Sequence, residues 1–129
     1  MKNIEIISIV NSYRLLHQVS EGIKLPVKVA WTRRVNMDKL FHAKGIIDEA
    51  LKEIRDKYFD DVHSEEHETE DGKKDRRIKK EYEQDFLNEQ KEITEQETDI
   101  EIRKVKLEDL GDVNLSDLEM DTLSFMLEE

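Results

Sequence analysis

The first hydrophobic pattern in the chain is that of a helix. Between residues 4 and 19, apolar side chains recur at intervals of three and four residues, and they would share one helix face: Ile6, Val10, Tyr13 and Leu16. Ile4 and Ile6 also alternate with the polar Glu5, which permits a short strand at the start. The Glu21-Gly22 pair then breaks the pattern. We expect an N-terminal helix over residues 4–19.

A second, longer helical pattern runs from Pro26 to about Phe59. Proline suits a first helical turn, because its missing N–H would be unpaired there in any case. The apolar positions that follow keep helical spacing: Ala30, Met37, Leu40 or Phe41, Ile47, Leu51, Ile54 and Tyr58. Gly45 is the weak point, since glycine costs up to about 1 kcal/mol relative to alanine inside a helix. It marks either a bend or a close contact with another helix.

Residues 60–74 show no apolar period and are rich in acids, so we expect an acidic flexible loop there. Helical spacing returns from about Asp75 to Gln96, where the apolar face comprises Ile78, Tyr82, Phe86 and Ile93. This segment would pack antiparallel to the long helix. The two together predict a helical hairpin.

From Thr98 to Leu107 the period changes to two, because Ile100 and Ile102 alternate with charged residues. The alternation resumes after a slip of one residue, which is typical of a strand with a bulge. A lone strand needs a partner. The candidates are residues 4–9 of the same chain or the equivalent strand of another copy.

The last segment contains a capping box, in which Ser116 precedes Glu119 by three residues and predicts a helix that starts at Ser116. Leu115 and Met120 occupy the flanking hydrophobic staple positions. The predicted fold is therefore mostly α (α+β), in a single domain over residues 1–129. It comprises a long helical hairpin, an N-terminal helix, a short strand region and a capped C-terminal helix.

Composition narrows the class of protein. The 129 residues include no cysteine, which excludes a disulfide scaffold and a zinc–thiolate site. Apolar residues make up 36% of the chain, below the usual value of roughly 45–50%, so the core should be thin. No apolar run approaches the length of about 18 residues that spans a membrane. We expect a cytoplasmic protein without a membrane partner.

The net charge of −11 is unevenly distributed. Residues 1–59 hold 11 bases and 7 acids, whereas residues 60–129 hold 10 bases and 25 acids, giving +4 and −15. No base follows Lys106. The acidic end of the chain either packs against the basic stretch Lys24–Lys44 or forms an external surface. The overall charge argues against non-specific binding to nucleic acid.

Candidate catalytic motifs are weak. The string His63-Ser64-Glu65-Glu66-His67 matches the H-x-x-E-H pattern of inverted zinc proteases. We reject His63 and His67 as metal ligands, because the string lies in an acidic run with no apolar face and no evident third ligand. His17 and His42 are interpreted as helix-surface or boundary residues. No Glu-x-x-His pair, nucleophile elbow or glycine-rich phosphate loop is present, so we expect no enzyme and no cofactor.

Two surfaces remain as candidates for binding. One is a basic strip with interleaved aromatic residues: Lys24, Lys28, Trp31, Arg33, Arg34, Lys39, Phe41 and Lys44. We interpret it as an amphipathic helix face with Trp31 in the core or an interface, and expect no direct DNA binding. The other is a row of carboxylates about 6 Å apart along a helix, which either is simply solvated or mimics phosphates in a protein groove. The candidate partner-binding residues are Glu81, Asp85, Glu89, Glu92, Asp112, Asp117, Asp121, Trp31, Arg33 and Arg34.

Two stretches resemble a family of small uncharacterised proteins from phages and prophages of Gram-positive bacteria. The first runs from Lys24-Leu25-Pro26-Val27-Lys28-Val29-Ala30 through the long helix to Asp56-Lys57-Tyr58, and the second spans residues 107–129. Together they cover roughly half the chain. The resemblance supplies no catalytic residue or ligand. It implies a non-enzymatic protein that acts inside the bacterial host cell or in particle assembly.

These observations lead to two expected functions. The first is a non-catalytic protein that binds a host or phage protein, as an acidic inhibitor of a nucleic-acid-handling defence enzyme of the anti-CRISPR or anti-restriction type. The alternative is a phage structural or assembly accessory protein that self-associates through the apolar hairpin or the unpaired strand, for which a high-order ring or filament is the expected assembly. A homodimer is a separate candidate oligomeric state.

Overall fold

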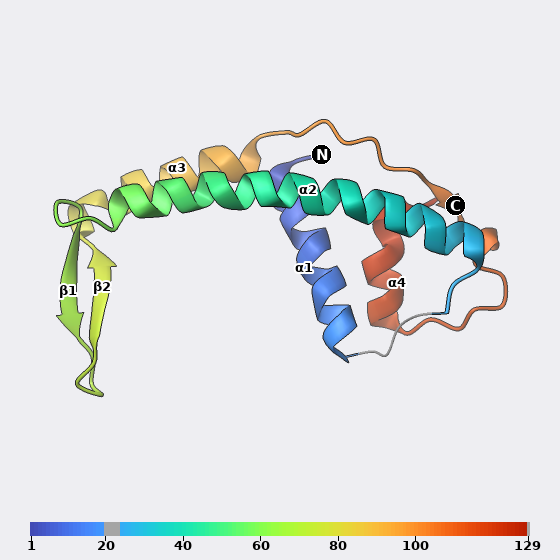
Figure 1. Ribbon diagram of the computed structural model, residues 1–129, viewed down its shortest axis with the longest axis horizontal. Coiled ribbons are helices and arrows are strands. Elements are labelled where there is room, and N and C mark those ends of the chain that lie inside the picture. Colours follow the sequence, from blue (N-terminus) through green and yellow to red (C-terminus); the bar gives the residue numbers. More distant parts are fainter. Residues whose placement is uncertain (20–23, 129) are drawn as a thin grey trace. The chain divides into compact units, whose positions relative to one another are not determined.

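The computed structural model describes residues 1–19 and 24–128, and the side chains of residues 17–19 are not part of that description. The chain divides into two compact units: unit 1 comprises residues 1–44 and 97–129, and unit 2 comprises residues 45–96 (Figure 1). Helices dominate both, with short strands, so the mostly α (α+β) class is confirmed. The single domain stays a prediction, because two compact units can belong to one domain or to two.

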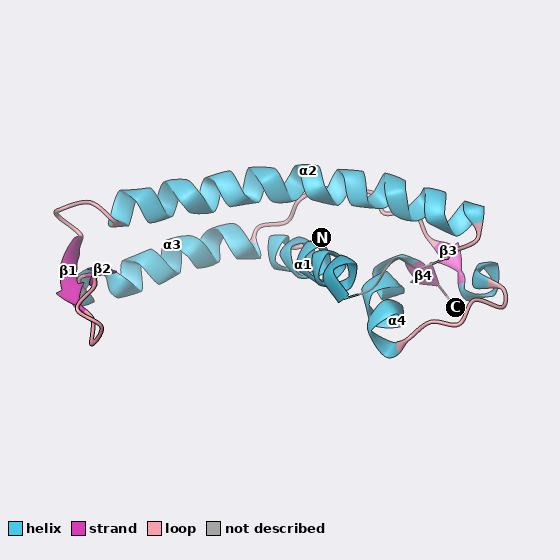
Figure 2. Cartoon of the chain, turned by 60° about the horizontal axis from the view of Figure 1, so that its bottom comes forward, coloured by secondary structure: helices cyan, strands magenta, loops and turns pink. Residues whose placement is uncertain are grey.

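Unit 1 begins with helix α1 (Asn3–Val19). The predicted N-terminal helix is confirmed, and the alternative of a strand at its start is wrong. Ile6, Val10 and Leu16 are all buried, and their spacing places them on one face of a helix. Helix α1 packs against α4 (Asp117–Leu123) in the same unit (Figure 2). The Glu21-Gly22 pair and the side chain of His17 lie outside the described residues.

Helix α2 (Val27–Tyr58) starts directly after Pro26, which confirms the long helix. Its residues up to Lys44 belong to unit 1 and the remainder to unit 2. The helix continues through Gly45. A Cβ placed on Gly45 would meet nothing within 4 Å, so the close helix contact expected there is wrong.

The C-terminal segment supplies much of the core of unit 1. Val29 at the start of α2 is buried in one cluster with Val105, Leu110, Leu123 and Met126. The 3-10 turn η2 (Leu107–Leu110) and the 3-10 turn η3 (Ser124–Met126) carry two of these side chains. The chain therefore returns from residue 97 onward to cover the first part of α2.

The strand region differs from the prediction. The strand β3 is limited to Val105–Lys106, and it pairs in parallel with β4 (Leu127–Glu128). The expected partner within the chain, residues 4–9, is therefore wrong, and pairing with another copy stays a prediction. The residues before β3 are extended, but side chains of α2 replace a neighbouring strand: Lys39 Nζ donates to the carbonyl of Glu101 at 3.0 Å.

The capped C-terminal helix is confirmed. The hydroxyl of Ser116 accepts a hydrogen bond from the backbone N–H of Glu119 at 3.2 Å, and α4 begins at the next residue, Asp117. This bond pairs one of the N–H groups that a helix start leaves without an internal partner. Leu123 is buried, whereas Leu118 and Met120 stay more than a third exposed.

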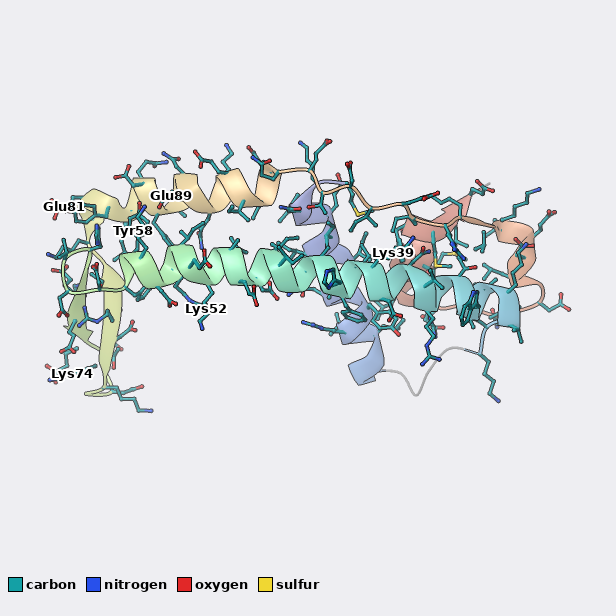
Figure 3. The ribbon with its side chains drawn as sticks, turned by 45° about the horizontal axis from the view of Figure 1, so that its top comes forward. Lys39, Lys52, Tyr58, Lys74, Glu81 and Glu89 are labelled. Atoms are coloured by element: carbon teal, nitrogen blue, oxygen red, sulfur yellow. The ribbon has the colours of Figure 1, made fainter. Side chains whose placement is uncertain are left out.

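Unit 2 contains the helical hairpin, but its second helix is shorter than predicted. Helix α3 (Glu83–Glu95) follows the 3-10 turn η1 (Lys80–Tyr82), rather than starting near residue 75. It pairs with the last turns of α2, where the rings of Tyr58 and Phe86 meet edge to face at 5.5 Å. Figure 3 shows Tyr58 and Glu89 between the two helices.

The acidic loop expected at residues 60–74 is largely wrong. A β-hairpin forms instead, in which β1 (Ser64–Glu68) pairs antiparallel with β2 (Lys74–Ile78). The register places acids opposite bases, with Glu65 facing Arg77, Glu66 facing Arg76 and Glu68 facing Lys74. Opposite charges across an antiparallel pair stabilise it. Gly72, with φ of 77°, supplies the left-handed residue that the connecting turn needs.

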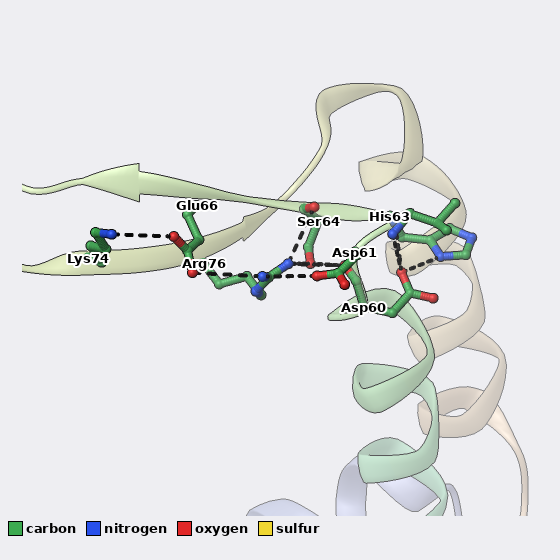
Figure 4. Close-up of polar contacts among 8 residues, drawn as sticks. Asp60, Asp61, His63, Ser64, Glu66, Lys74 and Arg76 are labelled. Atoms are coloured by element: carbon green, nitrogen blue, oxygen red, sulfur yellow. Dashed lines mark hydrogen bonds and ion pairs between the residues drawn. The ribbon is translucent and has the colours of Figure 1, made fainter.

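Asp60 and Arg76 fix the point where α2 turns into this hairpin (Figure 4). Asp60 Oδ1 accepts the backbone N–H groups of Val62 and His63, and these bonds lower the pKa of Asp60. Arg76 Nη1 donates to the carbonyl of Asp60 at 3.2 Å and to the hydroxyl of Ser64 at 2.9 Å. Arg76 thereby ties β2 to the end of α2.

Candidate binding groove

A groove of about 520 Å³ opens in unit 1 along α2. We call it the Trp31 groove, and it is lined by Tyr13, Leu25, Val27, Ala30, Trp31, Arg33, Arg34, Met37, Asp38 and Phe41. Most of these residues are apolar or aromatic, with two arginines and one aspartate among them. Tyr13 comes from α1, and the other residues come from α2 and the segment just before it.

Helical spacing explains why these side chains gather. Val27, Trp31, Arg34 and Asp38 follow each other at intervals of three or four residues, so they form one ridge along α2. Residues of the opposite ridge, such as Asn36 and Leu40, have no exposed surface. The first part of α2 therefore buries one face and presents the other at the groove.

Trp31 lies exposed in this groove. Its side chain is 60% exposed, and that of Val27 is 86% exposed. The expected core position for Trp31 is therefore wrong, and its role in an interface stays a prediction. An aromatic side chain carries the largest apolar area of any residue type, and a partner that covered it would remove that area from water.

Aromatic contacts hold one wall of the groove in place. The rings of Tyr13 and Phe41 meet edge to face at 5.7 Å. The guanidinium of Arg33 lies 5.9 Å from the centre of the Tyr13 ring, and that of Arg14 lies 5.6 Å from the Phe41 ring. Such cation–π contacts order the arginine side chains before any partner arrives. Preordered side chains lose less entropy on binding.

The C-terminal segment occupies the other face of α2 and engages its lysines. Lys28 Nζ lies 3.3 Å from Asp109 Oδ2, and Lys39 donates to the carbonyl of Glu101. The pKa of Asp109 is lowered by the backbone N–H of Lys106 and further by Lys28. Packing of the acidic end of the chain against the basic stretch is thus confirmed. The basic strip is divided, with these two lysines on one side and the arginines at the groove.

The acidic candidates of unit 2 lie in η1 and α3, and one of them is engaged internally. Glu89 Oε1 accepts a hydrogen bond from Lys57 Nζ at 2.7 Å, which lowers the pKa of Glu89. Glu81, Asp85 and Glu92 are exposed. Three of the four carboxylates in the row are therefore exposed to solvent.

The same carboxylate acts on Tyr58. Interaction with Glu89, together with burial, raises the pKa of Tyr58 to about 12. Glu89 is a structural residue between α2 and α3.

Asp112, Asp117 and Asp121 are exposed in α4 and the loop before it. None of them lines the Trp31 groove. The candidate residues from the sequence are thus placed at three separate locations, and only Trp31, Arg33 and Arg34 are brought together around one groove.

The two histidines of the H-x-x-E-H string are paired with carboxylates. His63 Nδ1 lies 2.8 Å from Asp60 Oδ1, and His67 Nε2 lies 3.0 Å from Glu65 Oε1. The string runs into strand β1, where residues four apart are separated by about 13 Å, so it lacks the helical spacing that zinc ligation needs. Among the side chains that the structure describes, those of residues 1–16 and 24–128, no group of three or more metal-binding residues is placed to hold an ion.

Sequence reasoning did not identify Tyr13, Val27 and Asp38 as groove residues. Tyr13 reaches the groove through the packing of α1, which a single-helix pattern does not contain. Val27 gave a usable signal, because it is an apolar residue on the same helix ridge as Trp31.

Among the described residues, no helix is long and apolar enough to cross a membrane. Comparisons of the chain with protein-family models, curated proteins and solved structures found no match. The resemblance to phage and prophage proteins therefore stays a prediction, and function has to be argued from the surfaces themselves.

Proposed function

We propose that this protein is a non-catalytic binding protein that recognises a protein partner through the Trp31 groove. The observation that carries the proposal is the exposed Trp31, which lines one groove with an even more exposed Val27 and with Arg33, whose guanidinium lies over the Tyr13 ring. Tryptophan and arginine are enriched among the residues that dominate binding energy at protein interfaces. A partner that covers this groove gains both apolar burial and charged contacts.

The partner we propose is a host or phage protein in the bacterial cytoplasm, in line with the resemblance of the segment around Pro26 and of the acidic end to phage proteins. Self-association through an unpaired strand has lost its basis, because β3 pairs with β4 within the chain. A homodimer through the strand is therefore not part of the proposal.

A second candidate function is inhibition of a nucleic-acid-handling enzyme through the acidic surface of unit 2. Residues 45–96 contain 18 acids and 10 bases, a net charge of −8, whereas unit 1 contains 14 and 11, a net charge of −3. Glu81, Asp85 and Glu92 are exposed on this unit. Such a surface favours contact with a basic groove of the kind that holds nucleic acid.

The test compares three variants against one purified partner. Wild-type protein immobilised on a resin first captures the partner from a bacterial lysate, and the partner is then purified and its affinity measured by calorimetry. We expect Trp31→Ala to weaken binding by about 30-fold or more, the loss typical of a hot-spot residue. Ile46→Ala is the matched control, because Ile46 is 59% exposed on the same helix but outside the groove.

The third variant reverses the charge of Glu81, Asp85 and Glu92 to lysine. Unchanged affinity in this variant, with a loss in Trp31→Ala, supports the groove. Loss of binding on charge reversal, with Trp31→Ala unaffected, contradicts the groove and supports the acidic surface instead.

A further inference from the structure

The chemistry of the Trp31 groove restricts what it can hold. Its floor is apolar, since Met37 is 2% exposed and Ala30 and Phe41 are partly buried beside it. Its charged lining comprises Arg33, Arg34 and Asp38. An occupant that satisfies both parts carries an apolar side chain for the floor and anionic groups for the arginines.

Resting on the proposed function, we infer that the occupant is a short acidic segment of the partner, with one apolar side chain inserted beside Trp31 and carboxylates on either side of it.

The two arginines favour several carboxylates rather than one anion. Consecutive residues of an α-helix point about 100° apart, so the Arg33 and Arg34 side chains leave α2 in different directions. The Arg33 guanidinium also lies over the Tyr13 ring, which holds it on its own side. Each guanidinium presents a planar fork that suits a carboxylate. Carboxylates spaced along a peptide can meet both forks.

A peptide fits the charge of this region better than a nucleic acid does. Nucleic acid binding needs a track of cations that follows the phosphate backbone. Lys28 and Lys39, which would extend such a track, are engaged by the C-terminal segment on the other face. Asp38 within the groove repels any anion, and a peptide can place its carboxylates away from Asp38, whereas a nucleic acid carries a charge at every phosphate. A peptide carries fewer charges and brings apolar area, which a phosphate chain lacks.

The chain's own acidic end does not fill this place. Asp109 of this end pairs with Lys28, and its Leu110, Leu123 and Met126 are buried in one cluster with Val29 of α2. The groove lies on the opposite ridge of the helix. The occupant is therefore assigned to the partner.

Trp31 is the chain's one tryptophan, so its fluorescence reports directly on the groove. The probe is a short synthetic peptide with blocked termini, in which pairs of glutamates alternate with pairs of leucines. Two counterparts replace its glutamates with lysine or its leucines with serine, and an oligothymidylate strand is the fourth ligand. We expect a saturable change in Trp31 emission with the glutamate–leucine peptide, at an affinity at least about tenfold above that of the other three.

A charge swap makes the test specific. The Arg33→Glu/Arg34→Glu variant should lose the glutamate–leucine peptide and gain the lysine–leucine peptide. The control is Lys52→Glu/Arg55→Glu, which makes the same change in net charge on exposed residues of α2 in unit 2 (Lys52 is labelled in Figure 3). This control should keep the preference of the wild type. Helix content measured by circular dichroism verifies that each variant is folded.

Three outcomes overturn the inference: no saturable change with the acidic peptide, tighter binding of oligothymidylate, or Trp31-dependent self-association of the protein alone by light scattering. If the glutamate–leucine peptide does not bind, but Trp31→Ala still weakens binding of the captured partner, the acidic occupant is ruled out and the proposed function stands. If Trp31→Ala has no effect on the captured partner, the proposed function itself fails.

Discussion

The side-chain amide of Asn36 forms two hydrogen bonds with the backbone of Arg103. Its Nδ2 donates to the Arg103 carbonyl at 2.9 Å, and its Oδ1 accepts the Arg103 N–H, also at 2.9 Å. Asn36 has no exposed surface. One helix side chain thus pairs both polar groups of an extended residue, as a neighbouring strand would, and this accounts for an extended segment before β3 that needs no strand beside it.

Replacing Asn36 with leucine keeps the size of the side chain and removes both bonds. The N–H and carbonyl of Arg103 then lose their partners, so we expect the free energy of unfolding to fall by roughly 2–3 kcal/mol. Urea denaturation measures the change. Asn11→Leu is the control, because Asn11 is exposed on α1 and should change stability by less than about 0.5 kcal/mol. Equal effects of the two substitutions would contradict the role of Asn36.

Gly45 is predicted to be a stabilising site when replaced by alanine. It lies inside α2, and a Cβ there meets nothing within 4 Å, so the gain in helix propensity of about 0.5–1 kcal/mol should appear in full. Thermal unfolding measures the gain. Gly72→Ala should have the opposite sign, since Gly72 has φ of 77° in the hairpin turn. A destabilised Gly45→Ala protein would show that the space beside the helix is filled.

Alkaline pH should weaken unit 2 through Tyr58. Its pKa lies at about 12 in the folded protein and at 10.0 ordinarily, so folding favours the neutral phenol. That contribution is complete below pH 10.0 and is lost as the pH rises towards about 12. The unfolding midpoint of the wild type should therefore fall more steeply across this window than that of Tyr58→Phe. Parallel curves for the two proteins would remove Tyr58 as the cause.

Two neighbouring arginines of β2 should differ in importance. Arg76 bonds to the Asp60 carbonyl and the Ser64 hydroxyl, whereas the guanidinium of Arg77 bonds to Asp75 within its own strand. Arg76→Ala should raise hydrogen exchange of the β1 and β2 amides and cost about 1–2 kcal/mol of local stability. Arg77→Ala, as an exposed ion-pair residue, should cost less than about 1 kcal/mol. Equal exchange in both variants would contradict the anchoring role of Arg76.

The helices could be predicted from the sequence because each carries a local signal. Buried residues recur at helical spacing in α1, Pro26 precedes α2, and Ser116 caps α4. These signals act over one or two turns and do not depend on what the helix packs against.

The β-hairpin could not be read in the same way, because its stabilising pairs lie between segments. Glu66 and Arg76 each look like part of a solvated charge run until the two runs are placed opposite each other. The strands β3 and β4, in which Val105 pairs with Leu127, are two residues long each. They are too short to show an alternating hydrophobic pattern in the sequence. Both features are products of tertiary contact.

The lining of the Trp31 groove could be predicted from the sequence only in part. Trp31, Arg33 and Arg34 were candidates from their types alone, but their separation from Lys28 and Lys39 depends on where the C-terminal segment packs. The exposure of Trp31 likewise follows from which face of α2 is covered. Residue type indicated a candidate surface, and the packing decided its extent.

The division of the chain into units has a consequence for the order in which structure can form. Unit 2 is continuous in sequence, so its residues are synthesised in one stretch, with no residue of unit 1 between them. Unit 1 is interrupted in sequence. The cluster around Val29 cannot form until Val105 and Met126 have been synthesised. Closing that long loop carries an entropic cost, which is smaller if the intervening residues are already compact. Early folding of unit 2 would thus speed the completion of unit 1. Mutations that destabilise unit 2, such as Arg76→Ala, should therefore slow formation of the Val29 cluster in unit 1.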